Sequence, residues 1–229
     1  ILISGNETAI HFQKKVRINT IFVFKGKRNT KQIFIAEVRS VAARNKWRST
    51  STFRFSLVTK YNITAQIPFI YKSSNALLQI PLSILYPLLQ NLHNEEHPTF
   101  EWIKTKCCNP NKAYVTTVIR KEIFPHIGTD TSPQTRRHKE EYAKMMVRRL
   151  KDVASGRRRP DDRDSLCSQL VDGPGNSIST LFRQLFRSHL TSLQYNMTKY
   201  LKSGKDISLT TFMNRKRMSN ALKYHFSVS

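Results

Sequence analysis

The sequence predicts an α+β protein, with mixed strands and helices, organised as two domains. Residues 1–70 alternate apolar and polar side chains as strands do, whereas apolar side chains after residue 71 recur at helical spacing. A chain of 229 residues is expected to form one large or two small domains. Because residues 155–176 are rich in Gly, Pro and charged side chains, as linkers are, we expect two domains.

The first predicted strands form a hairpin. Residues 21–24 are β-branched and aromatic, residues 26–29 have turn composition, and residues 33–38 fit the returning strand.

A second pair of strands is predicted at residues 51–58 and 63–70. The first of them alternates, with Phe53, Phe55 and Leu57 on one face. Pro68 predicts an edge position for the second, because proline has no N–H to donate to a neighbouring strand.

Helices are predicted over residues 81–92, 113–124, 135–153 and 177–202, with a shorter segment at 209–226. Pro81 is suited to the start of the first, and Pro125 ends the second. The third should bury Tyr142, Met145, Met146 and Leu150 on or near one face. In the fourth, the apolar stripe from Ile178 to Leu193 is predicted to be ordinary core packing.

The formal net charge of +24 points to a polyanionic partner. Nucleic acid is the first candidate and an anionic membrane the second. A hydrophobic fraction of 39% and an aromatic fraction of 10% exclude a disordered basic tail. The longest apolar stretch, Ala76–Leu89, is interrupted by Gln79 and two prolines and is too short to span a bilayer. We therefore expect no membrane partner.

Cysteine usage predicts a reducing compartment, since Cys107, Cys108 and Cys167 cannot build a disulfide framework. Adjacent cysteines also lack the spacing of a structural zinc site, even with His93 and His97 nearby. No nucleophile–base arrangement and no glycine-rich phosphate loop is found. The sequence therefore predicts no catalytic residue and no metal ligand.

One acidic cluster leaves two interpretations open. Asp161, Asp162 and Asp164 could hold Mg²⁺, which would make the chain a stand-alone basic nuclease or integrase-like enzyme. The other interpretation is a salt-bridged loop, favoured because neighbouring arginines neutralise the carboxylates.

Basic side chains in three places are candidate phosphate contacts. They are Lys223 with Tyr224, then Lys216, Arg215 and Arg217, then Arg157, Arg158 and Arg159. The Tyr224 ring adds a surface for stacking or hydrogen bonding.

Several short strings together resemble one protein family. They are Ile3-Ser4-Gly5-Asn6-Glu7, Ala36-Glu37-Val38-Arg39-Ser40, Lys121-Glu122-x-x-Pro125-His126-Ile127, Asp161-Asp162-Arg163-Asp164, Leu181-Phe182-Arg183-Gln184-Leu185-Phe186-Arg187, Asn214-x-Lys216 and Leu222-Lys223-Tyr224. In this order they resemble the second-largest subunit of multi-subunit DNA-dependent RNA polymerases, in the eukaryotic, archaeal and large-virus branch. The resemblance covers nearly the whole chain, which we expect to be an internal piece of that subunit.

The resemblance implies a domain layout. Residues 1–20 would end the first protrusion segment, 21–155 would be the lobe, and 156–229 would be the second protrusion segment, stopping before the first fork loop. The acidic cluster would be structural, at the junction of lobe and protrusion. Lys223 and Tyr224 would lie next to the RNA–DNA hybrid.

The resemblance also implies a role. The chain would form a wall of the DNA cleft and contact duplex or hybrid phosphates. The catalytic magnesium would be held elsewhere, so this piece would carry no cofactor. Its partners would be the largest subunit, other polymerase subunits, DNA and the RNA–DNA hybrid. It would work in the nucleus, or in the cytoplasm or virion if viral, and it would not be secreted.

Some positions depart from the family pattern. Ser168, Gln169 and Leu170 stand where the family usually has basic residues, and Thr8 replaces a frequent basic residue. A segment before Ala113 is missing relative to cellular nuclear enzymes. These differences indicate a divergent polymerase and leave a cellular origin and a viral or plasmid-borne one both open.

Overall fold

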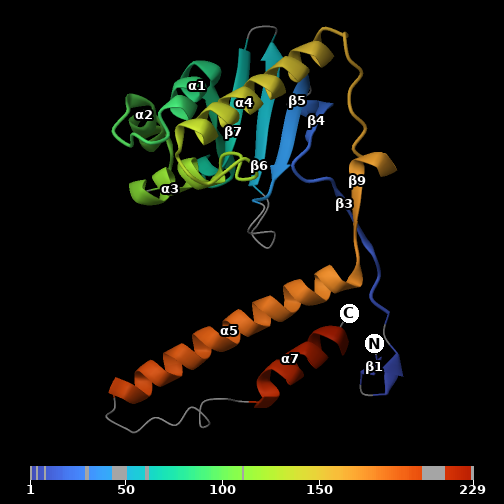
Figure 1. The fold of residues 1–229 in the computed structure, drawn as a ribbon. Helices are drawn as coiled ribbons and strands as arrows, with labels where there is room; N and C mark the ends of the chain where they lie inside the picture. Colours follow the sequence, from blue (N-terminus) through green and yellow to red (C-terminus); the bar gives the residue numbers. More distant parts are fainter. Residues whose placement is uncertain are drawn as a thin grey trace. The chain divides into compact units, whose positions relative to one another are not determined.

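The computed structural model describes residues 2–3, 5–7, 9–28, 31–42, 51–59, 62–109, 111–202 and 215–227. The chain divides into two compact units (Figure 1). Unit 1 contains residues 1–15 and 170–229, and unit 2 contains residues 16–169. These boundaries fall after residues 15 and 169, whereas the sequence placed them after 20 and 155. The names lobe and protrusion remain a prediction.

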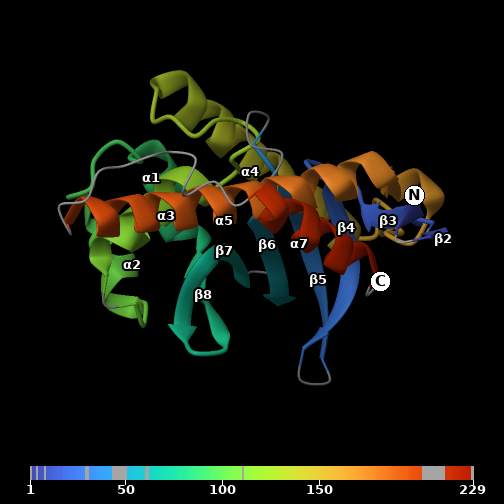
Figure 2. The ribbon, with the colours of Figure 1, turned by 90° about the horizontal axis from the view of Figure 1, so that it is seen from below.

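Unit 2 is built on an antiparallel sheet of five strands (Figure 2). Its strands, in spatial order, are β4 (Ile21–Arg28), β5 (Lys31–Ser40), β6 (Ser51–Thr59), β7 (Asn62–Ser73) and β8 (Ala76–Pro81). The predicted hairpin of β4 and β5 is confirmed, with Ile21 opposite Val38. Together with the helices described below, this sheet confirms the α+β fold class.

The predicted turn at residues 26–29 is wrong in part, because β4 continues through Gly26 to Arg28. Gly26 lies opposite Ile33 in the ladder. A Cβ atom at Gly26 would stand 2.6 Å from the Cδ1 atom of Ile35. The glycine therefore serves close packing against β5 rather than a turn.

The predicted edge position of Pro68 is also wrong. Strand β7 pairs with β6 on one side and with β8 on the other, so it is an inner strand. Pro68 is accommodated because the pairing with β8 shifts register between Gln66 and Tyr71. An irregularity of this kind removes the need for a ladder N–H, which is how proline is tolerated inside a sheet.

Helices pack against this sheet. They are α1 (Leu82–Gln90), α2 (Pro98–Lys106), α3 (Lys112–Glu122) and α4 (Pro133–Ala154). Helix α4 contacts β4, β5 and β6, whereas α1 and α3 contact β7. Local signals explain their starts: the Asn111 side chain accepts from the Tyr114 N–H at 3.0 Å, and the Ser132 hydroxyl accepts from the Thr135 N–H at 3.3 Å. The short helix α2 was not predicted.

The core of unit 2 lies between the sheet and its helices. Phe53 and Phe55 of β6 are fully buried, and the Phe53 ring packs 4.6 Å from the Phe124 ring. From α4, Met146 and Leu150 are fully buried as predicted, but Met145 is 38% exposed. One residue turns the helix by about 100°, which moves Met145 off the buried stripe.

Unit 1 consists of a small hairpin and two helices. The hairpin joins β1 (Leu2–Ile3) to β2 (Asn6–Glu7), and the helices are α5 (Pro174–Lys202) and α7 (Arg215–Ser227). Strand β3 (Gln13–Val16) pairs with β9 (Gln169–Asp172) where the chain passes between units. A 3₁₀ turn, η2 (Leu166–Ser168), precedes β9. The part of the predicted last segment before residue 215 lies outside the described residues.

The apolar stripe of α5, from Ile178 to Leu193, was predicted to pack in a core, and this prediction is wrong for the described residues. No residue of α5 is buried, and Phe182, Phe186 and Leu190 are each between 43% and 47% exposed. The rings of Phe182 and Phe186 stack on each other at 6.0 Å. The stripe is amphipathic as predicted, but the described part of unit 1 covers it only partly.

Among the described helices, none combines the length and the apolar character that crossing a membrane requires.

Candidate nucleic-acid interface

The acidic cluster ties the loop after α4 to the sheet of unit 2. One oxygen of Asp161 accepts from the Val23 N–H at 2.8 Å, and the other pairs with Arg158 at 2.7 Å. The Asp161 N–H donates in turn to the Val23 carbonyl at 2.7 Å. Asp162 accepts from the backbone N–H of Asp164 at 2.9 Å. Asp161 thus has both oxygens committed to protein partners.

Arg163, inside the same cluster, is directed toward the sheet. Its guanidinium lies 3.9 Å from the centre of the Phe24 ring and 3.9 Å from a carboxylate oxygen of Glu37. Glu37 is only 2% exposed and also binds Arg54 at 2.7 Å and Arg39 at 3.3 Å. A buried carboxylate needs such partners, because an unpaired charge is costly away from water.

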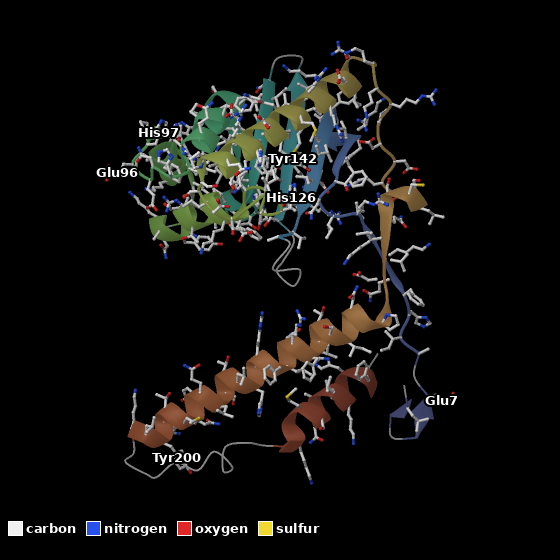
Figure 3. All side chains as sticks on the ribbon, in the orientation of Figure 1. Glu7, Glu96, His97, His126, Tyr142 and Tyr200 are labelled. Atoms are coloured by element: carbon white, nitrogen blue, oxygen red, sulfur yellow. The ribbon has the colours of Figure 1, made fainter. Side chains whose placement is uncertain are left out.

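Two of the quoted strings also meet at a serine–histidine contact. The Ser40 hydroxyl lies 2.6 Å from Nδ1 of His126 and accepts from the His126 N–H at 3.2 Å. Figure 3 labels His126 and Tyr142, whose rings are 4.8 Å apart. The strings at 36–40, 121–127 and 161–164 therefore converge on one region of unit 2. In the sequence, all three strings supported the family resemblance, but none of them indicated a role for Glu37, Ser40 or His126.

Burial shifts the pKa values in this region. Desolvation, helped by the nearby Lys139 ammonium, lowers the pKa of His126 to about 4. Burial likewise lowers the pKa of Lys139 to about 8 and raises that of Tyr142 to about 12. The Lys139 ammonium donates to the Arg120 carbonyl at 3.4 Å, near the end of α3, where the helix dipole favours a cation. Of these three groups, Lys139 is fully buried, whereas His126 and Tyr142 are half-buried.

The arginine run at residues 157–159 is divided in its roles. Arg157 pairs with Asp152 at 2.8 Å and Arg158 pairs with Asp161, whereas Arg159 is exposed and has no acidic partner among the described residues. Of the three predicted phosphate contacts, Arg159 is thus the one with its charge uncommitted.

The other predicted contacts lie on α7 of unit 1. Lys216, Lys223 and Tyr224 are exposed, Tyr224 by 64%. Lys216 and Lys223 are seven residues apart, so they share one face of the helix at about 10 Å along its axis. Arg215 and Arg217 belong to the same helix by their backbone, and their side chains lie outside the described residues.

A cavity of about 460 Å³ lies beside α7 within unit 1. Ile10, Ile178, Leu181 and Phe226 contribute apolar walls, and His11 and His225 contribute polar ones. Among the described residues, its lining contains no Lys or Arg.

The three cysteines are free thiols. Within the described ranges, no three His, Cys, Asp or Glu side chains come together as a metal site would require.

Comparison with known proteins shows what the chain is similar to. The family model described as RNA polymerase Rpb2, domain 2, matches residues 79–172, which run from β8 to β9. The chain is 25% identical to DNA-directed RNA polymerase II subunit RPB2 of Encephalitozoon cuniculi over 260 residues. It is 24% identical to RNA polymerase II subunit 2 of Arabidopsis thaliana and 24% identical to RNA polymerase subunit Rpo2 of Sulfolobus acidocaldarius.

Each of these three matches covers 97% of the chain. The chain is similar to these subunits over nearly its whole length. It spans 22% of the length of each of these relatives, so it is comparable to a part of such a subunit.

The structure places some predicted site residues on one helix and others in a different unit. Lys216, Lys223 and Tyr224 share α7 of unit 1, whereas Arg157, Arg158 and Arg159 belong to unit 2. The candidate interface is therefore two sets of basic residues, one on each unit.

Proposed function

We propose that this chain is part of the second-largest subunit of a DNA-directed RNA polymerase, where it forms a wall of the DNA cleft. The observation that carries the proposal is similarity to such subunits over 97% of the chain. In this role the chain contacts phosphates of duplex DNA or of the RNA–DNA hybrid. The chain takes part in RNA synthesis only as a part of the complete polymerase.

The charge of the chain supports this role. A folded body with a net charge of +24 repels itself unless polyanions neutralise it. Lys223 and Arg159 are exposed and have no acidic partner among the described residues, so their charges are available to phosphates. Contacts of this kind position nucleic acid without reading its sequence.

The proposal includes partners and a compartment. The largest subunit and the other polymerase subunits would surround this chain, and they or the rest of its own subunit would hold the catalytic magnesium. No residue of this chain is assigned to catalysis. The RNA polymerase II relatives favour the nucleus as its compartment.

The alternative, a stand-alone metal-dependent nuclease, has no support. Its proposed ligands were Asp161, Asp162 and Asp164, but Asp161 uses both carboxylate oxygens to hold Val23 and Arg158. A guanidinium at 2.7 Å from such a carboxylate competes with a divalent cation.

The decisive experiment measures binding of the full 229-residue chain to an RNA–DNA hybrid across a salt series with Mg²⁺ present. We expect intact nucleic acid and an affinity that falls steeply with salt, because phosphate contacts release counterions. Changing Lys223→Ala together with Tyr224→Ala should weaken binding at least about fivefold, through a lost phosphate contact and a lost stacking surface.

The matched control is Tyr195→Ala with Lys199→Ala, which removes the same residue types from exposed positions of α5 in the same unit. We expect this pair to change affinity less than about twofold. Equal losses in both variants would contradict the assignment to α7. Cleavage of the hybrid that Asp162→Ala abolishes would replace the proposal by the nuclease.

A further inference from the structure

A second charged feature of unit 2 is a hollow between α1, α4 and the segment after α4. Its volume is about 370 Å³, and its walls come from Tyr86 of α1, from Lys144, Val147, Arg148, Lys151 and Asp152 of α4, and from Arg157. Neither the motifs nor the proposed polymerase contacts account for it, apart from Arg157. Figure 3 shows the side chains that project along α4.

Cations line one face of α4 along this hollow. Lys144, Arg148 and Lys151 are spaced by four and three residues, so they lie one above the other on the helix surface. All three are exposed. They extend over about 10 Å of the helix axis.

Two of the four cations of the hollow, Lys144 and Arg157, are paired with carboxylates, whereas Arg148 and Lys151 are not within the described part of the chain. Lys144 pairs with Glu140 at 2.6 Å, and Arg157 pairs with Asp152 at 2.8 Å. Arg148 and Lys151 have no acidic partner among the described residues. Among the described residues, the wall of the hollow therefore carries two positive charges without an acidic partner, those of Arg148 and Lys151.

The floor of the hollow is apolar. Val147 is only 6% exposed, and the Tyr86 ring is half-buried. The Tyr86 hydroxyl makes no hydrogen bond to the described residues. Desolvation raises its pKa, so the group stays a neutral donor at physiological pH. A ligand of this hollow would thus meet apolar surface below and two cations at the rim.

The charge count distinguishes the possible ligands. Duplex DNA carries one negative charge per about 1.7 Å of axis, or about six charges over the length of this face. Only two cations are unpaired here, and Glu140 and Asp152 stand at the two sides, where they would repel a continuous phosphate backbone. A short segment with a few carboxylates matches the hollow better.

We propose that this hollow binds a short acidic segment of a partner protein, with its carboxylates on Arg148 and Lys151 and an aromatic or apolar side chain on Val147 and Tyr86. An extended segment places same-side residues about 6.6 Å apart, within reach of two long cationic side chains whose Cα atoms rise about 4.5 Å along α4. The inference does not depend on the polymerase assignment.

The test measures binding of a fluorescent peptide with the core Glu-Glu-Phe-Glu-Glu to the full chain by fluorescence anisotropy. Arg148→Ala with Lys151→Ala should weaken binding about tenfold, since two charge-assisted contacts are lost. The matched control is Lys25→Ala with Lys72→Ala, which removes two exposed cations from β4 and β7 of the same unit. This control should change affinity less than about twofold.

Two further arms complete the test. A peptide with Ser in place of Phe keeps every charge and should bind several-fold more weakly, because it forfeits apolar burial. The affinity of the chain for a single-stranded DNA of equal charge should not change when Arg148 and Lys151 are replaced by Ala. The proposal is overturned if both variant pairs lose peptide binding equally, or if the DNA loses affinity as the peptide does. Equal thermal unfolding midpoints of both variants exclude a folding defect.

Discussion

Several polar residues that are buried or half-buried in unit 2 are held by a specific partner. Glu37 is enclosed by arginines, Ser40 binds His126, and Lys139 donates to the end of α3. Each contact joins segments far apart in the chain, so these residues fix how strand, helix and loop meet. Other buried side-chain atoms of unit 2 have no hydrogen-bond partner among the described residues; they are Thr64 Oγ1, His126 Nε2, Arg136 Nε, the Tyr142 hydroxyl and Gln169 Oε1.

His126 should make stability depend on pH. Its pKa is about 4 in the folded chain, below the ordinary value of 6.5, so the folded state binds fewer protons between these values. Stability is therefore fully present above pH 6.5 and is lost as the pH falls toward 4. Because the ring is only partly buried and solvent screens it, we expect a loss on the order of 1–2 kcal/mol.

Urea unfolding at several pH values measures this loss. His126→Gln keeps a polar side chain at the site and removes the titrating group. The difference in stability between the two chains therefore isolates the contribution of the histidine from that of the carboxylates, which titrate in the same pH range. The variant should lose less stability between pH 6.5 and 4. If the unfolding free energies of both chains changed with pH in parallel, His126 would not be a cause of the pH dependence of stability.

At the scale of elements, the periodicity of apolar residues predicted which side chains are buried, except where contacts with distant segments changed what a position tolerates. Strand β6, which carries Phe53, Phe55 and Leu57, and helix α4, which carries Met146 and Leu150, follow their predicted faces. Pro68 and Gly26 were misplaced because a register shift and a close neighbour, neither visible in one segment, determine what those positions tolerate.

Two adjacent methionines of α4 test this burial pattern. Met146→Ala should cost about 2–5 kcal/mol of unfolding free energy, because Met146 is fully buried and its removal leaves a cavity. Met145→Ala, the control, should cost less than about 1 kcal/mol, since that side chain is 38% exposed. Chemical denaturation measures both. Similar losses would mean that the helix is rotated relative to the sheet.

At the scale of the whole molecule, charge is the dominant feature. The +24 charge extends over both units, and the cations are more numerous than the acids that pair with them. The chain therefore carries a self-repulsion that nucleic acid would relieve under the proposed function.

Salt should stabilise the chain for this reason. We expect the thermal unfolding midpoint to rise as NaCl increases from about 0.05 M to about 0.5 M, because the Debye length shortens and repulsion between like charges is screened. Differential scanning calorimetry measures the midpoint. Heparin should raise it further, with uncharged dextran as the control. A midpoint that falls with salt would mean that ion pairs outweigh the repulsion.

The candidate interface was predictable only in part. The residues on α7 and in the arginine run were named from charge alone, but pairing could not be read from the sequence. Arg157 and Arg158 turned out to be held by Asp152 and Asp161, whereas Arg159 was not. The Arg148/Lys151 hollow was missed because its wall includes Tyr86, some 60 residues earlier in the chain.

The sequence by itself determined the α+β class, most of the helices and strands and the family resemblance, because periodicity and short strings are local properties. The tertiary structure alone decided that Pro68 lies in an inner strand, that Asp161 holds β4, and that Glu37 and Arg163 meet. It also decided that the α5 stripe stays partly exposed within the described residues. These outcomes depend on which distant segments come together, and a single segment carries no information about its neighbours.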